Sequence, residues 1–287
     1  MNKWWWAMPV LPALGLAAYL GYSSYVANAL MDIPRLPVNG SPGDVGLDYE
    51  DISFLSRDDN IELRGWYVGG GEPCVIIVNG GHQTRNDEVT GTLQLTRDLV
   101  GQGFSVLLFD FRGRGESGGT GKTLTHNDRD IGGAIDYLRG RGCSKVYAIG
   151  FSSGGAALSM FTDNLAGLVL DSCFADVHEL FLRQGVAKGY PELFVRAISP
   201  GVFNMARLLH GYNAMSPKDR IRDVNCPILF IHGGDDEDIP PSNSQELYDA
   251  RGNPQDSLWI VPNAGHTYSY KSDPAGYMSR VEEFTAR

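Results

Sequence analysis

Short apolar runs alternate with helix-length stretches along most of this chain, and that alternation limits its fold more than any other feature. Several runs are apolar at every position and rich in β-branched residues, which is typical of strands buried on both faces of a parallel sheet. The predicted strands are 74–80, 104–110, 145–150, 166–171, 227–233 and 258–262. The predicted helices lie near 87–101, 127–140, 153–164, 242–251 and 273–286. The order strand, helix, strand, helix predicts an α/β fold with a doubly wound sheet.

A predicted hairpin precedes the parallel strands. Residues 49–55 and 61–68 each alternate apolar and polar side chains, and Asp58-Asp59-Asn60 between them favours a turn. The sheet is therefore expected to be mostly parallel with an antiparallel start.

Composition bounds the size and the partners of the folded part. The chain has 287 residues, 43% of them hydrophobic, which is enough for one large α/β domain or two smaller ones with a substantial core. Its net charge of −10 argues against a nucleic-acid partner, because nucleic acids select basic surfaces. The four cysteines show neither CxxC spacing nor clustering with histidine, so no metal site is expected. Their spacing determines neither a disulfide nor a redox compartment.

Residues 4–31 carry no charge, and we expect them to anchor the chain in a membrane. A helix of about 20 apolar residues crosses the hydrocarbon core of a bilayer, which is about 30 Å thick. Aromatic side chains favour the membrane–water interfaces. They stand near both ends of the segment, at Trp4–Trp6 and at Tyr19, Tyr22 and Tyr25. The predicted organisation is a transmembrane helix over 1–31, a linker over 32–47 (with the turn-rich stretch 39–44), and a folded domain over 48–287.

Two other interpretations of the amino-terminal segment stay open. Ala27-Asn28-Ala29 resembles the A-x-A site at which a signal peptide is cleaved. Pro9 and Pro12 suit the start of a helix better than its middle, which fits an interfacial or buried helix.

The flanks and the small residues of the segment carry two further expectations. Lys3 and the amino group precede the span, so the positive-inside rule favours a cytoplasmic tail and an exported folded domain. Ala13, Ala17 and Gly21 recur every four residues, a spacing that lets two helices approach closely and would allow a homodimer.

The stretch from Cys173 to Cys226 is too long for an ordinary crossover between neighbouring strands. It is rich in large apolar side chains, and Pro191 and Pro200 are expected to break it into two or three short helices. One interpretation is a single crossover helix with a surface excursion. The other is a small helical cap, residues 173–226, over the carboxyl edge of the sheet, where it would line an apolar pocket for an acyl chain.

The sequence Gly150-Phe151-Ser152-Ser153-Gly154 follows a predicted strand and precedes a predicted helix. G-x-S-x-G in that context indicates a nucleophile elbow, a tight turn that exposes the serine hydroxyl. Ser152 is the predicted nucleophile, and Ser153 is expected to supply a main-chain N–H.

A serine nucleophile needs a base, and the base needs an acid to orient it. His266 follows the last predicted strand, which makes it the candidate base. Asp236, at the end of the strand before it, is the first candidate for the acid, with Asp235 second and Asp171 third. The chain order Ser, Asp, His is the order of the nucleophile-elbow enzymes.

These residues resemble the α/β-hydrolase-fold serine hydrolases, of the esterase, lipase and thioesterase type. The resemblance covers nearly all of 48–287 and rests on the opening hairpin, CVIIVNGG, FDFRGRGESGG, GFSSGG, HGGDDEDIP and NAGH. The family pattern H-G-x-x-D implies Asp236 as the acid. It also implies an oxyanion hole made by the N–H groups of Gly81 and Ser153. The usual His-Gly of the oxyanion loop is Asn79-Gly80 here, followed by His82, which is a departure from the family.

The resemblance implies a hydrolase of carboxylic esters, with an acyl ester or a lipid as substrate and with no metal or organic cofactor. Ester and thioester cleavage use the same residues, so an acyl-thioesterase or S-deacylase is the alternative, as is a serine peptidase of the same fold. A catalytically dead scaffold module is the alternative outside enzymes.

Overall fold

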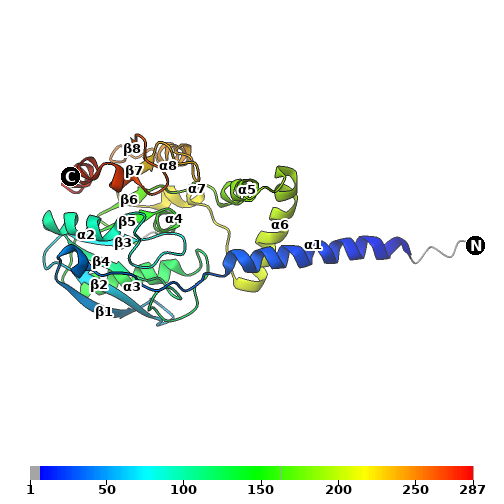
Figure 1. Cartoon of the computed structure of the whole chain (residues 1–287), viewed down its shortest axis with the longest axis horizontal. Coiled ribbons are helices and arrows are strands. Elements are labelled where there is room, and N and C mark those ends of the chain that lie inside the picture. Colours follow the sequence, from blue (N-terminus) through cyan, green and yellow to red (C-terminus); the bar gives the residue numbers. More distant parts are fainter. Residues whose placement is uncertain (1–6, 162, 287) are drawn as a thin grey trace, which may run out of the picture. The chain divides into compact units, whose positions relative to one another are not determined.

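The computed structural model describes residues 7–161 and 163–286, in two compact units (Figure 1). Trp4–Trp6, expected at a membrane interface, lie outside the described residues. Ile33–Asp176 and Ser216–Arg287 form the sheet unit, and Met1–Asp32 with Val177–Met215 forms the helical unit.

The sheet unit is built on one sheet, which has eight strands in the part of the chain that the structure describes. In spatial order these are β1 (Tyr49–Leu55), β2 (Glu62–Val68), β4 (Ser105–Phe109), β3 (Cys74–Val78), β5 (Val146–Phe151), β6 (Gly167–Asp171), β7 (Ile228–Gly233) and β8 (Ser257–Val261). The pairs β1–β2 and β2–β4 are antiparallel, and the pairs from β4 to β8 are parallel. The expected mostly parallel sheet with an antiparallel start is confirmed.

Helices cover both faces of this sheet (Figure 1). The first layer contains α3 (Asn127–Gly140), α4 (Ser153–Ser159), α7 (Pro217–Arg220) with the 3-10 turn η2 (Ile221–Asp223), and α8 (Ser242–Arg251). The second layer contains α2 (Thr92–Gly101), α9 (Ser269–Ser272) and α10 (Pro274–Thr285). Strands β3 to β7 are buried along their whole length, since both of their faces meet helices.

The segment expected to be a linker is folded onto the sheet unit. The Arg35 guanidinium donates hydrogen bonds to the carbonyls of Gly115, Ser117 and Gly119. Further on, η1 (Pro42–Val45) packs beside α2. The chain therefore joins the sheet unit directly after α1.

The helical unit consists of α1 (Ala7–Met31), α5 (Val177–Ala187) and α6 (Glu192–His210), with α6 packed on both α1 and α5 (Figure 1). The helices α5 and α6 lie within the predicted cap of residues 173–226. The coverage of Ser152 by this segment stays a prediction. The pairing of two chains through Ala13, Ala17 and Gly21, which are exposed, also stays a prediction.

Pro200 does not break the helix, contrary to the expectation from the sequence; it lies inside α6. The Tyr19 hydroxyl supplies the physical reason. It accepts a hydrogen bond from the N–H of Gly201 at 3.0 Å and donates one to the carbonyl of Ala197 at 3.1 Å. Both backbone groups thus keep a partner beside the proline, where a helix otherwise loses hydrogen bonds.

Helix α1 is long and apolar enough to cross a membrane. Val10–Met31 has a mean hydropathy of 1.3, and only 11% of its most apolar stretch is buried within the described chain. A signal sequence passes the same criterion of length and composition, whereas the core helix of a soluble protein would be mostly buried.

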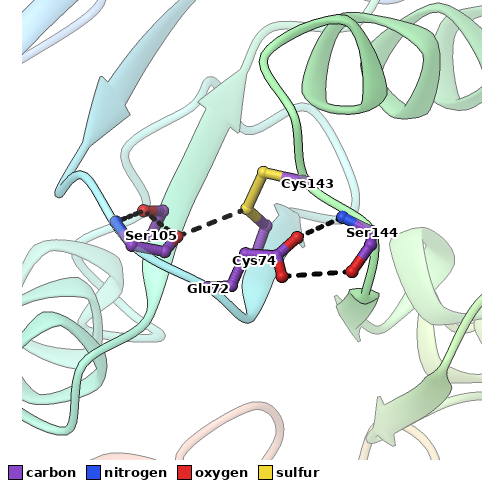
Figure 2. The surroundings of a disulfide bond; sticks show 6 residues. Glu72, Cys74, Ser105, Cys143 and Ser144 are labelled. Carbon is purple, nitrogen blue, oxygen red and sulfur yellow. Dashed lines mark hydrogen bonds between the residues drawn. A yellow bond between two sulfur atoms is a disulfide. The ribbon is translucent and has the colours of Figure 1, made fainter.

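A disulfide between Cys74 and Cys143 ties the start of β3 to the loop before β5 (Figure 2). The two Cα atoms are 6.1 Å apart, and both residues are buried. Beside it the Glu72 carboxylate accepts hydrogen bonds from the N–H and the hydroxyl of Ser144 (Figure 2). The remaining cysteines, 173 and 226, are free and buried.

The first prediction counts thiols. Protein trapped with acid from intact cells, then denatured and treated with a maleimide mass tag, should carry two tags, and four after reduction. The free energy of unfolding of the Cys74→Ala, Cys143→Ala double variant should be about 4 kcal/mol lower than that of the wild-type protein. The reason is that the disulfide, which joins residues 69 apart in the sequence, no longer restricts the unfolded chain. Four tags before reduction would show that the pair is not oxidised in the cell.

Candidate active site

Ser152 lies in a strained turn between β5 and α4. Its backbone has φ 51° and ψ −119°, outside the regions that non-glycine residues favour. The turn is closely packed: a side chain at Gly80 would collide with the Phe151 carbonyl, and one at Gly154 with the Val78 carbonyl. The strand–turn–helix arrangement of a nucleophile elbow is therefore present around Ser152.

His266 and Asp236 converge on this serine from the loops after β8 and β7. His266 Nε2 lies 3.0 Å from Ser152 Oγ, and His266 Nδ1 lies 2.7 Å from Asp236 Oδ2. An ionised carboxylate only accepts hydrogen bonds, so Nδ1 carries the proton and Nε2 is free to accept the one on Ser152. The three residues predicted from the sequence thus form a hydrogen-bonded series that runs from Ser152 through His266 to Asp236.

The electrostatics of the pair favour a charged carboxylate and a basic imidazole. Burial by itself would raise the pKa of Asp236, but hydrogen bonds from His232, His266 and the N–H of Ile239 outweigh it and lower that pKa. Burial likewise opposes the charged form of His266, yet the neighbouring Asp236, with smaller contributions from Asp238 and Asp171, raises its pKa above the ordinary value.

His232 contacts Asp236, and the sequence analysis did not assign it to the site. Its Nε2 lies 2.7 Å from the Ile239 carbonyl and 3.2 Å from Asp236 Oδ2, and its Nδ1 lies 2.6 Å from Ser244 Oγ. The Ile239 N–H donates to Asp236 Oδ1 at 2.8 Å. His232 and the Ile239 N–H therefore hold the Asp236 carboxylate in place. The signal was present in the sequence, because His232 is the first residue of the H-G-x-x-D pattern.

Asp171, the third candidate for the acid, supports the loop that carries the histidine. Its Oδ1 accepts hydrogen bonds from the hydroxyls of Ser172 and Ser269, both at 2.9 Å, and Ser172 Oγ accepts one from the N–H of Thr267. Asp171 is fully buried, which raises the pKa of its carboxyl to about 6. It lies beside the site without contacting His266 Nδ1.

The second candidate, Asp235, is exposed, whereas Asp236 is only 4% exposed. Burial and the hydrogen bonds to its oxygens therefore separate these two adjacent carboxylates.

The expected oxyanion loop lies against the elbow. The Gly81 N–H, one of the two expected oxyanion donors, already has a hydrogen-bond acceptor. The Gly81 N–H donates a hydrogen bond to Ser153 Oγ at 2.7 Å, and Gly81 has φ +55°. His82 follows Gly81 and is exposed. Partial removal of its ring from water and the positive charge of Arg114 lower its pKa. Within the described residues no cluster of three or more His, Cys, Asp or Glu side chains could hold a metal ion.

The fold agrees with that of the proteins to which this chain is similar. Residues 75–280 match the alpha/beta hydrolase family, which is more than half of the chain. The chain belongs to this family. An uncharacterised protein of Mycobacterium tuberculosis, Rv2307c, is 32% identical over 222 residues, which cover 74% of this chain and 70% of the relative.

Some proteins to which the chain is similar carry an activity in their names. The lysophosphatidylserine lipase ABHD12 of Macaca fascicularis is 24% identical over 310 residues, covering 93% of this chain and 74% of that protein. Among solved structures, an esterase of Pyrococcus furiosus, Pf2001, has a TM-score of 0.76 at 24% identity and covers 90% of this chain and 98% of its own. This structural likeness shows the fold.

The second prediction tests the roles of the site residues in ester hydrolysis. Ser152→Ala and His266→Ala should each lower kcat/KM for a short p-nitrophenyl ester by at least about 10⁴-fold, and Asp236→Asn by about 10⁴-fold. Asp235→Asn is the matched control, because its carboxylate is exposed, and should stay within about twofold. A greater loss for Asp235→Asn than for Asp236→Asn would mean that the acid is wrongly assigned.

The third prediction is a pH profile of the same reaction. Protonated His266 cannot accept the Ser152 proton, so kcat/KM should rise with pH through the pKa of His266, which lies above the ordinary value of about 6.5. In Asp236→Asn the carboxylate is gone and burial favours the neutral ring. The rise in the residual activity should then move to lower pH, whereas Asp235→Asn should leave it in place. An unmoved profile in Asp236→Asn would contradict the assignment.

Proposed function

We propose that this chain is a membrane-anchored serine hydrolase that cleaves carboxylic esters of lipids through a Ser152–Asp236–His266 triad. The observation that carries the proposal is the hydrogen-bonded series from Ser152 Oγ through His266 to Asp236, with distances of 3.0 and 2.7 Å. These are hydrogen-bond distances that a nucleophile and its base need for proton transfer.

The reaction uses only side chains, backbone N–H groups and water. His266 Nε2 takes the Ser152 proton as Oγ attacks the ester carbonyl carbon. The imidazolium so formed is stabilised by Asp236, and it then gives the proton to the departing alcohol oxygen. An acyl-enzyme remains on Ser152. His266 next takes a proton from water, the hydroxide attacks the acyl carbon, and the proton returns to Ser152 as the acid leaves.

The proposed oxyanion hole is formed by the N–H groups of Gly81 and Ser153. Support comes from the close packing of the 80–81 loop on the elbow. In the resting site the Ser153 hydroxyl accepts the Gly81 N–H, and the substrate oxygen would replace it. One such donor is typically worth about 3 kcal/mol of transition-state stabilisation.

A lysophospholipid is the substrate class that the relatives favour. Four ABHD12 proteins are 22–25% identical to this chain, and each is named a lysophosphatidylserine lipase. A single-chain phospholipid also suits an enzyme tethered to a bilayer, because the tether keeps the enzyme at high local concentration near lipids.

The anchor and its side are part of the proposal. The exposed apolar helix α1 supports a membrane span. The Cys74–Cys143 disulfide supports an oxidising, non-cytoplasmic location for the sheet unit, because cytosolic thiols are kept reduced. The single charge of Lys3 before the span favours the same orientation.

The fourth prediction tests this function. Full-length protein in detergent should react with a fluorophosphonate probe, and Ser152→Ala should abolish the reaction while Ser153→Ala retains it. The wild-type protein should hydrolyse lysophospholipids and acyl esters faster than thioesters of the same chain length.

Absence of probe labelling would leave the scaffold alternative standing, whereas faster thioester cleavage would identify an S-deacylase.

A further inference from the structure

The helical unit exposes large apolar side chains on two of its helices. On α1 the exposed residues are Val10, Leu11, Leu14, Leu16, Leu20, Tyr22 and Tyr25. On α6 and the α5–α6 turn they include Tyr190, Leu193 and Phe194, of which Leu193 is 81% exposed. A bilayer that holds α1 would cover the first set. The second set lies outside the predicted span.

The two sets are joined by aromatic contacts. The rings of Tyr25 and Tyr22 are 6.4 Å apart, Tyr22 and Phe194 are 5.8 Å apart, and Phe194 and Tyr190 are 6.0 Å apart, between centroids. We call these four residues together with Leu193 the aromatic patch. It continues from the carboxyl-terminal part of α1 onto the start of α6 without a break.

Hydrogen bonds between α1 and α6 hold the aromatic patch at this position on α1. Tyr19, one turn before Tyr22 and Ser23, bridges Gly201 and Ala197 of α6 through its hydroxyl. Near the other end of α6, His210 Nε2 lies 2.7 Å from Asn28 Oδ1. Because a side chain at Gly201 would collide with Tyr19 and Ser23, the two helices pack in close contact.

Charge separates the helical unit from the rest of the chain. By its residues the helical unit carries five basic and three acidic side chains, a net charge of +2. Since the whole chain has a net charge of −10, the sheet unit has a net charge of −12. Lys188 and Arg196, both exposed, stand on either side of the aromatic patch in the sequence. Arg196 forms an exposed ion pair with Glu192 at 2.8 Å, so Lys188 is the basic residue beside the patch for which no ion pair is found among the described residues. Anionic lipid attracts such a basic and aromatic surface and repels an acidic one.

We propose that the aromatic patch is a second membrane contact, which inserts into the headgroup–acyl boundary of an anionic bilayer beside α1. This rests on the proposed membrane anchor. Within α1, 18 residues separate Ala7 from Tyr25, or about 27 Å of helix, so Tyr22 and Tyr25 reach the level of an interface when α1 spans a hydrocarbon core of about 30 Å. Aromatic rings prefer that level. Since Phe194 packs on Tyr22 and Tyr190 packs on Phe194, both side chains lie close to the same level and would fix the depth of α1.

The test places a spin label at Leu193→Cys in the full-length protein, reconstituted in phosphatidylcholine vesicles with about a third phosphatidylglycerol. Leu14→Cys on α1 reports the span, and the exposed residue Gln102→Cys of the sheet unit is the water-exposed control. Protein without an added cysteine controls for labelling of the buried Cys173 and Cys226. Circular dichroism checks that each variant is folded.

The expected result is a nickel-chelate accessibility at position 193 about fivefold lower than at position 102, with oxygen accessibility raised. A label at 193 that is as accessible to nickel as the one at 102, while the label at 14 is in lipid, would overturn the proposal and leave the anchor intact. Dipolar broadening at 193 would show a second copy of the chain on the patch and would also overturn it. None of these readouts depends on hydrolysis, so loss of the proposed activity is recognised separately by probe labelling of Ser152.

Discussion

Close backbone packing at one edge of the sheet is the constraint on which the rest of the site depends. At the turn after β5 the neighbouring segments approach so closely that Gly80 and Gly154 leave no space for a side chain. This packing holds Ser152 at a positive φ with its hydroxyl toward His266. The strain of such a residue is maintained only where the surrounding structure fixes it from several sides. Here the surrounding structure consists of parallel strands that are buried along their whole length.

Much of this arrangement could be predicted from the sequence because it follows from local patterns. Apolar runs and turn signals identify the strands, and strands of a parallel sheet bring their carboxyl ends to one edge. The candidates Ser152, Asp236 and His266 each follow such a run, and the structure places His266 within hydrogen-bond distance of both Ser152 and Asp236. Neighbouring Asp235 and Asp236 differ through burial, which the sequence showed only indirectly through the family pattern.

Other features depend on contacts between distant segments and could not be predicted. The pairing of Cys74 with Cys143 follows from the adjacency of β3 and β5, which no cysteine spacing reveals. Pro200 was expected to interrupt a helix, yet Tyr19, 181 residues earlier in the chain, satisfies the neighbouring backbone groups. The helix predicted over 153–164 ends at Ser159, before the chain enters β6. At Pro200 a tertiary partner outweighs a local preference.

The hydrogen bond between Gly81 and Ser153 would affect substrate selection in the proposed oxyanion hole. A donor that is already satisfied gains little when a neutral ester carbonyl replaces a hydroxyl, since both are uncharged acceptors of similar strength. It gains much more when the oxygen becomes negatively charged, because hydrogen bonds to ions are about twice as strong. If Gly81 is an oxyanion donor, as proposed, the exchange would favour the transition state over the bound ground state, and it would discourage unreactive carbonyl compounds from occupying the site. The Ser153 hydroxyl would thus compete with the substrate for the Gly81 N–H. Its displacement would be favourable only when the substrate oxygen becomes negatively charged during the reaction.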